Sequence, residues 1–262
     1  MGSPVNVDSL HYWGPISDHA PCCSSIKYAH LNTVNNSWVK AAQQQAVCDR
    51  ALTVSNSSTN FTISDTIIVT HSMGSLLVGA AIAGGMCELS SSSTWVSMAT
   101  PMSGSMGSDF AQDVCDGKSN ALMEKVADIR QQCPVNIATK SVAYENGTRS
   151  FSHLNRAYKS AQKAYRKHVS AAMCSSSSSG LLSTYQARFW LLSEIVPHKS
   201  KQNDGMVEYA SCTSGLDEGK FESDYRSRFY RSKLNHWDMQ FKSGDGLLNK
   251  AKMPVKWFEC LL

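Results

Sequence analysis

The chain has 262 residues, of which 42% are hydrophobic and 18% charged, with a formal net charge of +4. These values are typical of a globular protein with a substantial core and exclude a wholly disordered chain. The small net charge gives no argument for nucleic-acid binding, so we expect no nucleic-acid partner. No apolar run reaches the ~20 residues that a helix needs to cross a bilayer, so we expect no transmembrane segment.

The first half of the chain alternates between strand and helix patterns. IKYAHLNTV (26–34) predicts a short strand, and SWVKAAQQQAVCDRAL (37–52) has apolar residues at near-helical spacing. TIIVT (66–70) is a β-branched run typical of a central parallel strand covered on both faces. The small residues of 74–83 predict a helix that packs closely on the sheet, and TWVSMAT (94–100) predicts the next strand. This order predicts an α/β fold with a mainly parallel sheet.

Residues 104–192 differ from this pattern. They contain mixed helical patterns and a serine run at 175–180, and their only strand signal is KSVAY (140–144). We interpret 104–192 as a helical cap or lid insertion within a single domain that spans residues 1–262. After it, a strand is expected near 230–234, followed by a closing helix near VKWFECLL.

A basic helix is predicted within this insertion at 154–170. It carries five Lys or Arg residues and no acid, and its apolar stripe consists of Leu154, Tyr158, Ala161, Tyr165 and Val169. A charged helix face usually lies in solvent, and we favour that interpretation. The alternative is peripheral contact with an anionic membrane or lipid surface.

Cysteines and glycosylation sequons indicate the compartment. The nine cysteines are dispersed without a CxxC pair, which does not resemble a metal site, so no metal is predicted. Four Asn-x-Ser/Thr sequons begin at Asn35, Asn56, Asn60 and Asn146. Together they favour a secreted, extracellular glycoprotein with disulfides, against the alternative of chance sequons in a chain rich in Ser and Asn.

The start of the chain does not fit secretion. Residues 1–10, MGSPVNVDSL, have neither the basic start nor the apolar stretch of a signal peptide. Either the protein is not secreted, or Met1 is internal to a longer protein. We favour the second interpretation.

The segment Thr70-His71-Ser72-Met73-Gly74 joins the predicted buried strand to the predicted small-residue helix. A serine hydroxyl on such a sharp turn is exposed for attack on a carbonyl carbon, provided that a histidine removes its proton and a carboxylate orients the histidine. The alternative is an ordinary crossover turn of a parallel sheet.

Two later segments could supply these partners. QNDGMVEYASC places Asp204 before Gly205 in a turn, where the bend allows the carboxylate to face the carboxyl edge of the sheet. LNHWDMQF places His236 just after the strand expected near 230–234.

The segments THSMGS, ATPMSGS, NDGMV and NHWDM, in this order, resemble the lipase/esterase branch of the α/β-hydrolase superfamily. The resemblance covers most of residues 25–262, although Thr70 replaces the first glycine of Gly-x-Ser-x-Gly. It implies an α/β-hydrolase fold and a serine hydrolase that cleaves carboxylic esters through an acyl-enzyme. Ser72 would be the nucleophile, His236 the base, Asp204 the orienting acid, and the Met73 N–H one oxyanion donor.

The same resemblance implies a small-molecule or lipid ester as substrate and no metal or organic cofactor. Other residues are weaker candidates for the site. His198 precedes Asp204 and so violates the Ser, Asp, His order of the family, and Asp238 and Asp245 are alternatives to Asp204. His71 lies inside the turn, where a packing role is expected.

The chain departs from the family at its beginning. The second oxyanion donor of the family follows an early strand and a His-Gly pair, and no such segment occurs here. Residues 1–15 look like the remainder of that loop, so we expect early strands to be missing and activity to be impaired. The alternative function is a non-catalytic secreted binding module on a decayed hydrolase fold, which the intact set of Ser72, Asp204 and His236 opposes.

Overall fold

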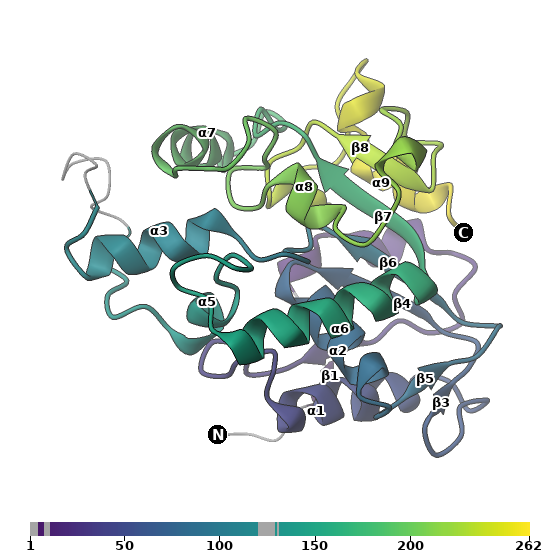
Figure 1. Ribbon diagram of the computed structural model, residues 1–262. Helices are drawn as coiled ribbons and strands as arrows, with labels where there is room; N and C mark the ends of the chain where they lie inside the picture. Colours follow the sequence, from purple (N-terminus) through teal and green to yellow (C-terminus); the bar gives the residue numbers. More distant parts are fainter. Residues whose placement is uncertain (1–4, 8–10, 120–128, 130) are drawn as a thin grey trace.

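The computed structural model describes residues 5–7, 11–119, 129 and 131–262. The expectation about Met1 therefore lies outside the described residues. The chain forms an α/β fold in which most strand pairs are parallel (Figure 1). The predicted fold class is confirmed at this level.

The central sheet has four parallel strands in the order β4-β6-β7-β8. Their bounds are Ile67–His71, Thr94–Met98, Val169–Ser175 and Phe229–Ser232. Two small sheets lie apart from it. In the first, β1 (Val5–Val7) pairs antiparallel with β2 (Tyr28–His30), and in the second, β3 (Thr62–Ile63) pairs parallel with β5 (Glu88–Leu89).

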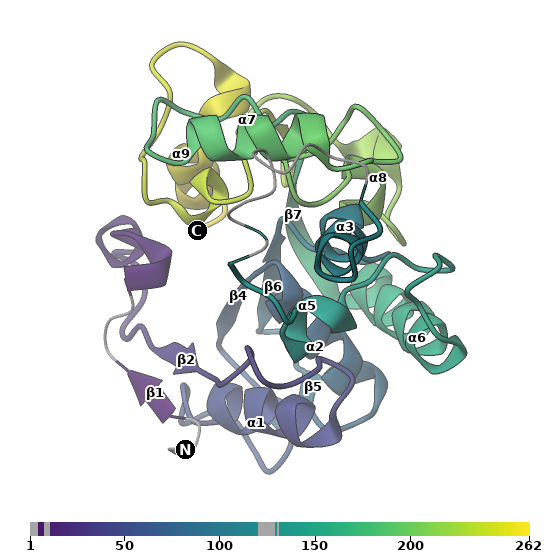
Figure 2. The ribbon, with the colours of Figure 1, turned by 90° about the vertical axis from the view of Figure 1, so that its left-hand side faces the viewer.

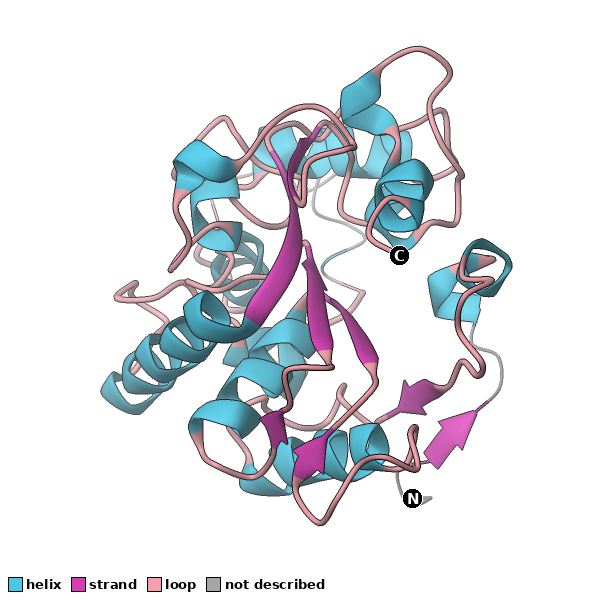
Figure 3. Ribbon diagram, turned by 90° about the vertical axis from the view of Figure 1, so that its right-hand side faces the viewer, coloured by secondary structure: helices cyan, strands magenta, loops and turns pink. Residues whose placement is uncertain are grey.

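Helices cover both faces of the central sheet (Figure 3). On one face α2 (Met73–Ala83) packs beside α6 (Ser152–His168), and α1 (Ala41–Leu52) packs on α2. On the other face lie α9 (Pro254–Glu259) and the 3-10 helix η2 (Ile16–His19).

The remaining helices gather on the side toward which the strands point (Figure 2). They are α3 (Met106–Cys115), α5 (Ile137–Ser141), α7 (Gln186–Ile195) and α8 (Tyr209–Cys212). The short 3-10 helices are η1 (His11–Trp13), η4 (Glu218–Lys220), η5 (Asp238–Gln240) and η6 (Lys250–Lys252).

The two faces of the sheet have separate apolar cores, because successive strand residues point to opposite faces. Trp95 of β6 packs with Leu76 of α2 and Tyr158 of α6 in one core. Its neighbour Val96 packs in the other core, with Trp257 of α9. A sheet buried on both sides requires apolar residues at consecutive positions, as the sequence of β6 has.

The predicted strands and helices before residue 104 all occur, with shifted ends. The helix expected at 37–52 begins only at Ala41, and the strand expected at 26–34 shrinks to the three residues of β2. One expectation is wrong: the run TIIVT is not central. It forms β4, which lies at an edge of the sheet among the described residues, and Ile67 is 39% exposed.

The range 104–192 contains a sheet strand that the sequence pattern does not predict. Val169–Ser175 forms β7 between β6 and β8, whereas the expected strand KSVAY ends α5 and continues as a loop. Most residues of β7 are small or polar, VSAAMCS, and the strand lacks the β-branched run that marks a strand in a sequence. The basic helix is present as α6. Its stripe is buried against α2, except for half-buried Val169, which lies just past the helix, and its five Lys and Arg residues are exposed.

Three disulfides join Cys48 to Cys87, Cys115 to Cys133 and Cys174 to Cys212. The asparagines of all four sequons are exposed, in loops and turns. Within the described residues, no helix combines the length and the hydropathy that a membrane span requires.

Candidate active site

Ser72 lies at a sharp turn between β4 and α2, with φ 54° and ψ −132°. A positive φ is strained for a residue with a side chain and persists only where the surroundings enforce it. Here the Ser72 N–H donates to the Met98 carbonyl oxygen at 2.9 Å, and the Ser75 N–H donates to the Ser72 carbonyl oxygen at 3.1 Å. The turn places the half-buried Ser72 side chain at the carboxyl edge of the sheet.

A network of buried polar side chains next to this turn stabilises it. The Thr70 hydroxyl accepts a hydrogen bond from the Trp95 indole N–H at 2.8 Å and lies 2.9 Å from the Ser75 hydroxyl. Ser97 of β6 donates to Ser75 at 2.9 Å. Threonine at position 70 therefore satisfies a buried indole N–H that a glycine would leave without a partner.

His236 lies between Ser72 and Asp204. Its Nε2 is 3.1 Å from the Ser72 Oγ, and its Nδ1 is 2.8 Å from the Asp204 Oδ2. Asp204 and His236 are both buried. A carboxylate that accepts from Nδ1–H leaves the Nε2 lone pair directed at the serine hydroxyl, which is the arrangement that proton transfer from serine requires.

The loop around Asp204 explains how the carboxylate is aimed. Its Oδ1 accepts from the N–H groups of Met206 and Val207 at 2.8 and 2.7 Å, which leaves Oδ2 for His236. Gly205 has φ +93°, and a Cβ there would lie 2.8 Å from the Phe189 carbonyl oxygen, so the position needs glycine. The loop lies between α7 and α8 rather than directly after a strand.

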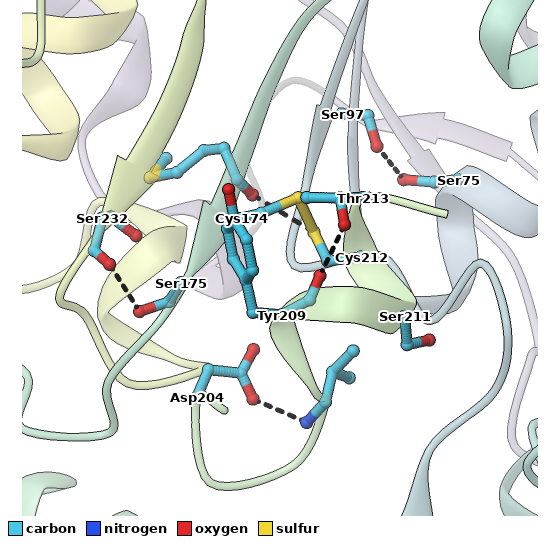
Figure 4. Close-up of a disulfide and its surroundings, with 12 residues drawn as sticks. Ser75, Ser97, Cys174, Ser175, Asp204, Tyr209, Ser211, Cys212, Thr213 and Ser232 are labelled. Atoms are coloured by element: carbon cyan, nitrogen blue, oxygen red, sulfur yellow. Dashed lines mark hydrogen bonds between the residues drawn. A yellow bond between two sulfur atoms is a disulfide. The ribbon is translucent and has the colours of Figure 1, made fainter. Parts of the chain in front are cut away.

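The disulfide between Cys174 and Cys212 ties α8, which follows this loop, to β7 of the sheet. Figure 4 shows Asp204 on the loop that leads toward Tyr209 and this disulfide. The covalent link limits how far the carboxylate can move from the sheet edge.

His198 and Glu208 hold the other side of the same loop. His198 Nδ1 lies 2.6 Å from Glu208 Oε1, and both side chains are buried. The Glu208 carboxylate also accepts from the Met106 N–H at the start of α3, at 3.5 Å. His198, weighed from the sequence as an alternative base, therefore pairs with Glu208 and not with Ser72. Nothing in the local sequence marks this pair.

The alternative acids have other partners. Asp238 accepts from the Leu181 N–H at 2.7 Å and from the Asn235 amide at 2.6 Å, and burial raises its pKa. Asp245 accepts from the N–H groups of Val255 and Lys256 at the start of α9. Neither carboxylate forms a hydrogen bond with His236.

His71 packs as the sequence suggests, but it also makes two hydrogen bonds. Its Nε2 lies 2.9 Å from the His236 carbonyl oxygen and its Nδ1 lies 2.6 Å from the Tyr12 hydroxyl. Burial, and next the neighbouring His236, lower the pKa of His71 well below its usual value, and burial raises the pKa of Tyr12 to about 12. Sequence reasoning misses Tyr12, which is remote in the chain and lies in no recognisable motif.

The Met73 N–H begins α2, where first-turn N–H groups have no partner within the helix. It makes no hydrogen bond to any other described residue. It is therefore free to donate to a negative oxygen next to Ser72. Among the described residues, no group of three His, Cys, Asp or Glu side chains is arranged to hold a metal ion.

In comparisons with known proteins, no family model matches the chain and no curated protein matches it. The α/β fold with its hydrogen-bonded chain of Ser72, His236 and Asp204 is therefore the basis for assigning a function.

Proposed function

We propose that the chain is an α/β-hydrolase-like serine hydrolase that cleaves carboxylic esters through an acyl-enzyme. The observation that carries this proposal is the continuous hydrogen-bonded chain from Ser72 through His236 to Asp204, which begins at a strained turn. These three hydrogen-bonded side chains come from distant parts of the sequence, and their arrangement requires the burial of a charged group, which is energetically unfavourable. Such an arrangement favours a chemical role over a structural one.

Acylation begins when the Ser72 Oγ attacks the ester carbonyl carbon and its proton passes to His236 Nε2. The new oxyanion accepts a hydrogen bond from the Met73 N–H. His236 then gives the proton to the departing alkoxide oxygen, the C–O bond breaks, and the acyl group remains on Ser72. In the second half, His236 takes a proton from water, the hydroxide attacks the acyl carbon, and the proton returns to Ser72 as the acid leaves.

Asp204 keeps the Nδ1 proton of His236 in place and stabilises the imidazolium that forms in both halves. It performs this task with one oxygen only, since the other is held by the loop N–H groups of Met206 and Val207. The carboxylate therefore cannot rotate away without breaking two hydrogen bonds.

The class of ester is inferred from the resemblance to lipases and esterases. A small-molecule or lipid ester fits that resemblance. An extracellular location is supported by the three disulfides and by the four exposed sequon asparagines. A mass shift of the secreted protein on treatment with a peptide N-glycosidase tests the location.

A fluorophosphonate probe tests the reaction class. We expect stoichiometric labelling that peptide mapping assigns to Ser72, loss of labelling in Ser72→Ala, and a large loss of rate in His236→Ala. Ser160→Ala, on the exposed face of α6, is the matched control and is expected to label as the unaltered protein does.

A panel of p-nitrophenyl esters with acyl chains of graded length then defines the substrate. Absence of labelling in a folded protein would contradict the hydrolase and favour a non-catalytic binding module on this fold.

A further inference from the structure

A second hydrogen-bonded chain lies behind the proposed base. It runs from the Tyr12 hydroxyl on η1 to His71 at the end of β4, and from His71 to the backbone carbonyl of His236. The His71 and His236 rings also touch, with centroids 4.7 Å apart. Tyr12, in the N-terminal segment, is thus linked to His236 through the imidazole of His71.

The donor of each hydrogen bond in this chain can be derived from the last acceptor, the His236 carbonyl oxygen. The His236 carbonyl oxygen can only accept, so His71 Nε2 carries a proton and donates. If the ring is uncharged, Nδ1 then has a free lone pair, and the Tyr12 O–H must donate to it. Both conditions fit the pKa directions, since His71 resists protonation and Tyr12 keeps its proton.

Burial, and next the charges of His236 and Lys242, disfavour a proton on His71. His236 faces one side of the ring and Tyr12 the other, and Asp204 lies beyond His236 as its partner. The Lys242 ammonium lies 5.6 Å from the centre of the Tyr12 ring, and its charge also lowers the pKa of His71. In the proposed mechanism His236 becomes positively charged, and a second imidazolium in contact with it would oppose that step.

We propose that Tyr12 is a positioning residue of the proposed hydrolase. By donating to His71 Nδ1 it occupies the lone pair that would otherwise take a proton, and it holds His71 as an uncharged donor to the His236 carbonyl. His236 then takes the Ser72 proton without competition from its neighbour. This inference rests on the proposed function.

Removal of the Tyr12 hydroxyl has a specific consequence. In Tyr12→Phe the Nδ1 lone pair of His71 is open to a proton from solvent, so two adjacent imidazoles compete for protons as the pH falls. A charge on either ring hinders transfer from Ser72 to His236. The acidic limb of the activity profile therefore moves to higher pH, since protonation of either ring stops the transfer.

The test measures kcat/KM for a p-nitrophenyl ester, and the rate of fluorophosphonate labelling, from about pH 5 to about pH 9. In the unaltered protein we expect one protonation and a loss of about tenfold per pH unit on the acidic limb. In Tyr12→Phe the limb moves to higher pH and keeps this slope, because a charge on one imidazole disfavours a charge on the other.

Two further variants separate positioning from stability. Tyr230→Phe removes the hydroxyl of a buried tyrosine, which donates to the Lys250 carbonyl oxygen at 2.7 Å, and is expected to leave the position of the acidic limb unchanged. In the double variant Tyr12→Phe/His71→Gln, the glutamine amide can still donate to the His236 carbonyl but takes no proton. That variant is expected to return the acidic limb to its position in the unaltered protein.

An acidic limb of Tyr12→Phe that superimposes on that of the unaltered protein would overturn the proposal. So would a double variant whose acidic limb stays at the higher pH of Tyr12→Phe. If the folded protein neither labels nor cleaves esters, the proposed function fails instead. The imidazole C–H resonances of His71 then decide this inference alone: they are expected not to titrate in the unaltered protein and to titrate in Tyr12→Phe.

Discussion

Asp204 binds His236 twice. Its Oδ2 lies 2.8 Å from the His236 Nδ1, and its backbone carbonyl oxygen accepts from the His236 N–H at 3.0 Å. The backbone contact fixes the position of the histidine, and the side-chain contact fixes the tautomer of its ring.

The Asp204→Asn variant separates these two contacts. The asparagine oxygen can keep the bonds to Met206 and Val207, so its NH₂ faces His236 Nδ1 and forces the ring proton onto Nε2, toward Ser72. We expect kcat for ester hydrolysis to fall by about 10⁴-fold with little change in Tm. Exposed Asp217→Asn is the control, and a loss of less than about tenfold would contradict the role of Asp204.

A glycine at position 70 should weaken the protein. Thr70→Gly leaves the buried Trp95 indole N–H without its acceptor, at a cost of about 1–3 kcal/mol in the free energy of unfolding. Thr70→Ser keeps the hydroxyl and is expected to remain close to the original stability. Urea unfolding measures both, and equal stability of the glycine variant would refute the role of this network.

Two glycines near the site should differ in their tolerance of alanine. At Gly74 a Cβ would lie 3.9 Å from the Thr70 Cβ, an ordinary contact, so Gly74→Ala should keep or raise stability, by up to about 1 kcal/mol. At Gly104, φ is +83° and a Cβ would overlap the Ala143 carbonyl oxygen. Gly104→Ala should therefore lose more than about 2 kcal/mol. Thermal unfolding of the two variants compares them, and the reverse ranking would contradict the turn geometry.

Because of the carboxyl group of Asp109, in α3, we expect the stability of the folded protein to depend on pH. Burial raises its pKa from 3.8 to about 6. Between these values the folded state binds more protons than the unfolded state, so this carboxyl lowers stability as the pH rises from about 4 to about 6. Above that window the loss is complete.

Asp109→Asn removes this titration and should be more stable than the unaltered protein at about pH 8, with the gain fading toward about pH 4. Asp113→Asn, which removes the negative charge that accepts from the Arg149 Nε and Nη2, should instead lose stability at the higher pH. Urea unfolding at the two pH values checks both signs. A gain for Asp109→Asn that persists at about pH 4 would argue against burial as the cause.

The local pattern of the chain was sufficient for the alternation of strands and helices and for the candidates Ser72, Asp204 and His236. Consecutive β-branched residues predict β4, and the glycine after Asp204 predicts the bend at which φ is +93°. Such features depend on the residues within a few positions, so a single sequence displays them. The structure brings the three candidates together, while their catalytic roles remain predictions.

Lateral neighbours within the sheet could not be inferred in this way. An apolar run such as TIIVT indicates that a strand has apolar surroundings, but not whether another strand lies on each side of it, and β4 lies at an edge. The strand β7 is not predicted because alanine and serine have little strand propensity. Its alanines are buried instead by tertiary packing, Ala172 in the core that contains α6 residues and Ala171 in the core that contains α9 residues.

Only the tertiary structure decided the pairing of the cysteines, the contact of His198 with Glu208, and the reach of Tyr12 to His71. Each of these depends on which distant segments meet when the chain closes around its two cores. Which segments meet depends on packing over the whole molecule, and it cannot be predicted from the periodicity of a short segment. The sequence by itself determined the elements before residue 104 and the candidate side chains of the site, and packing determined which of these side chains touch.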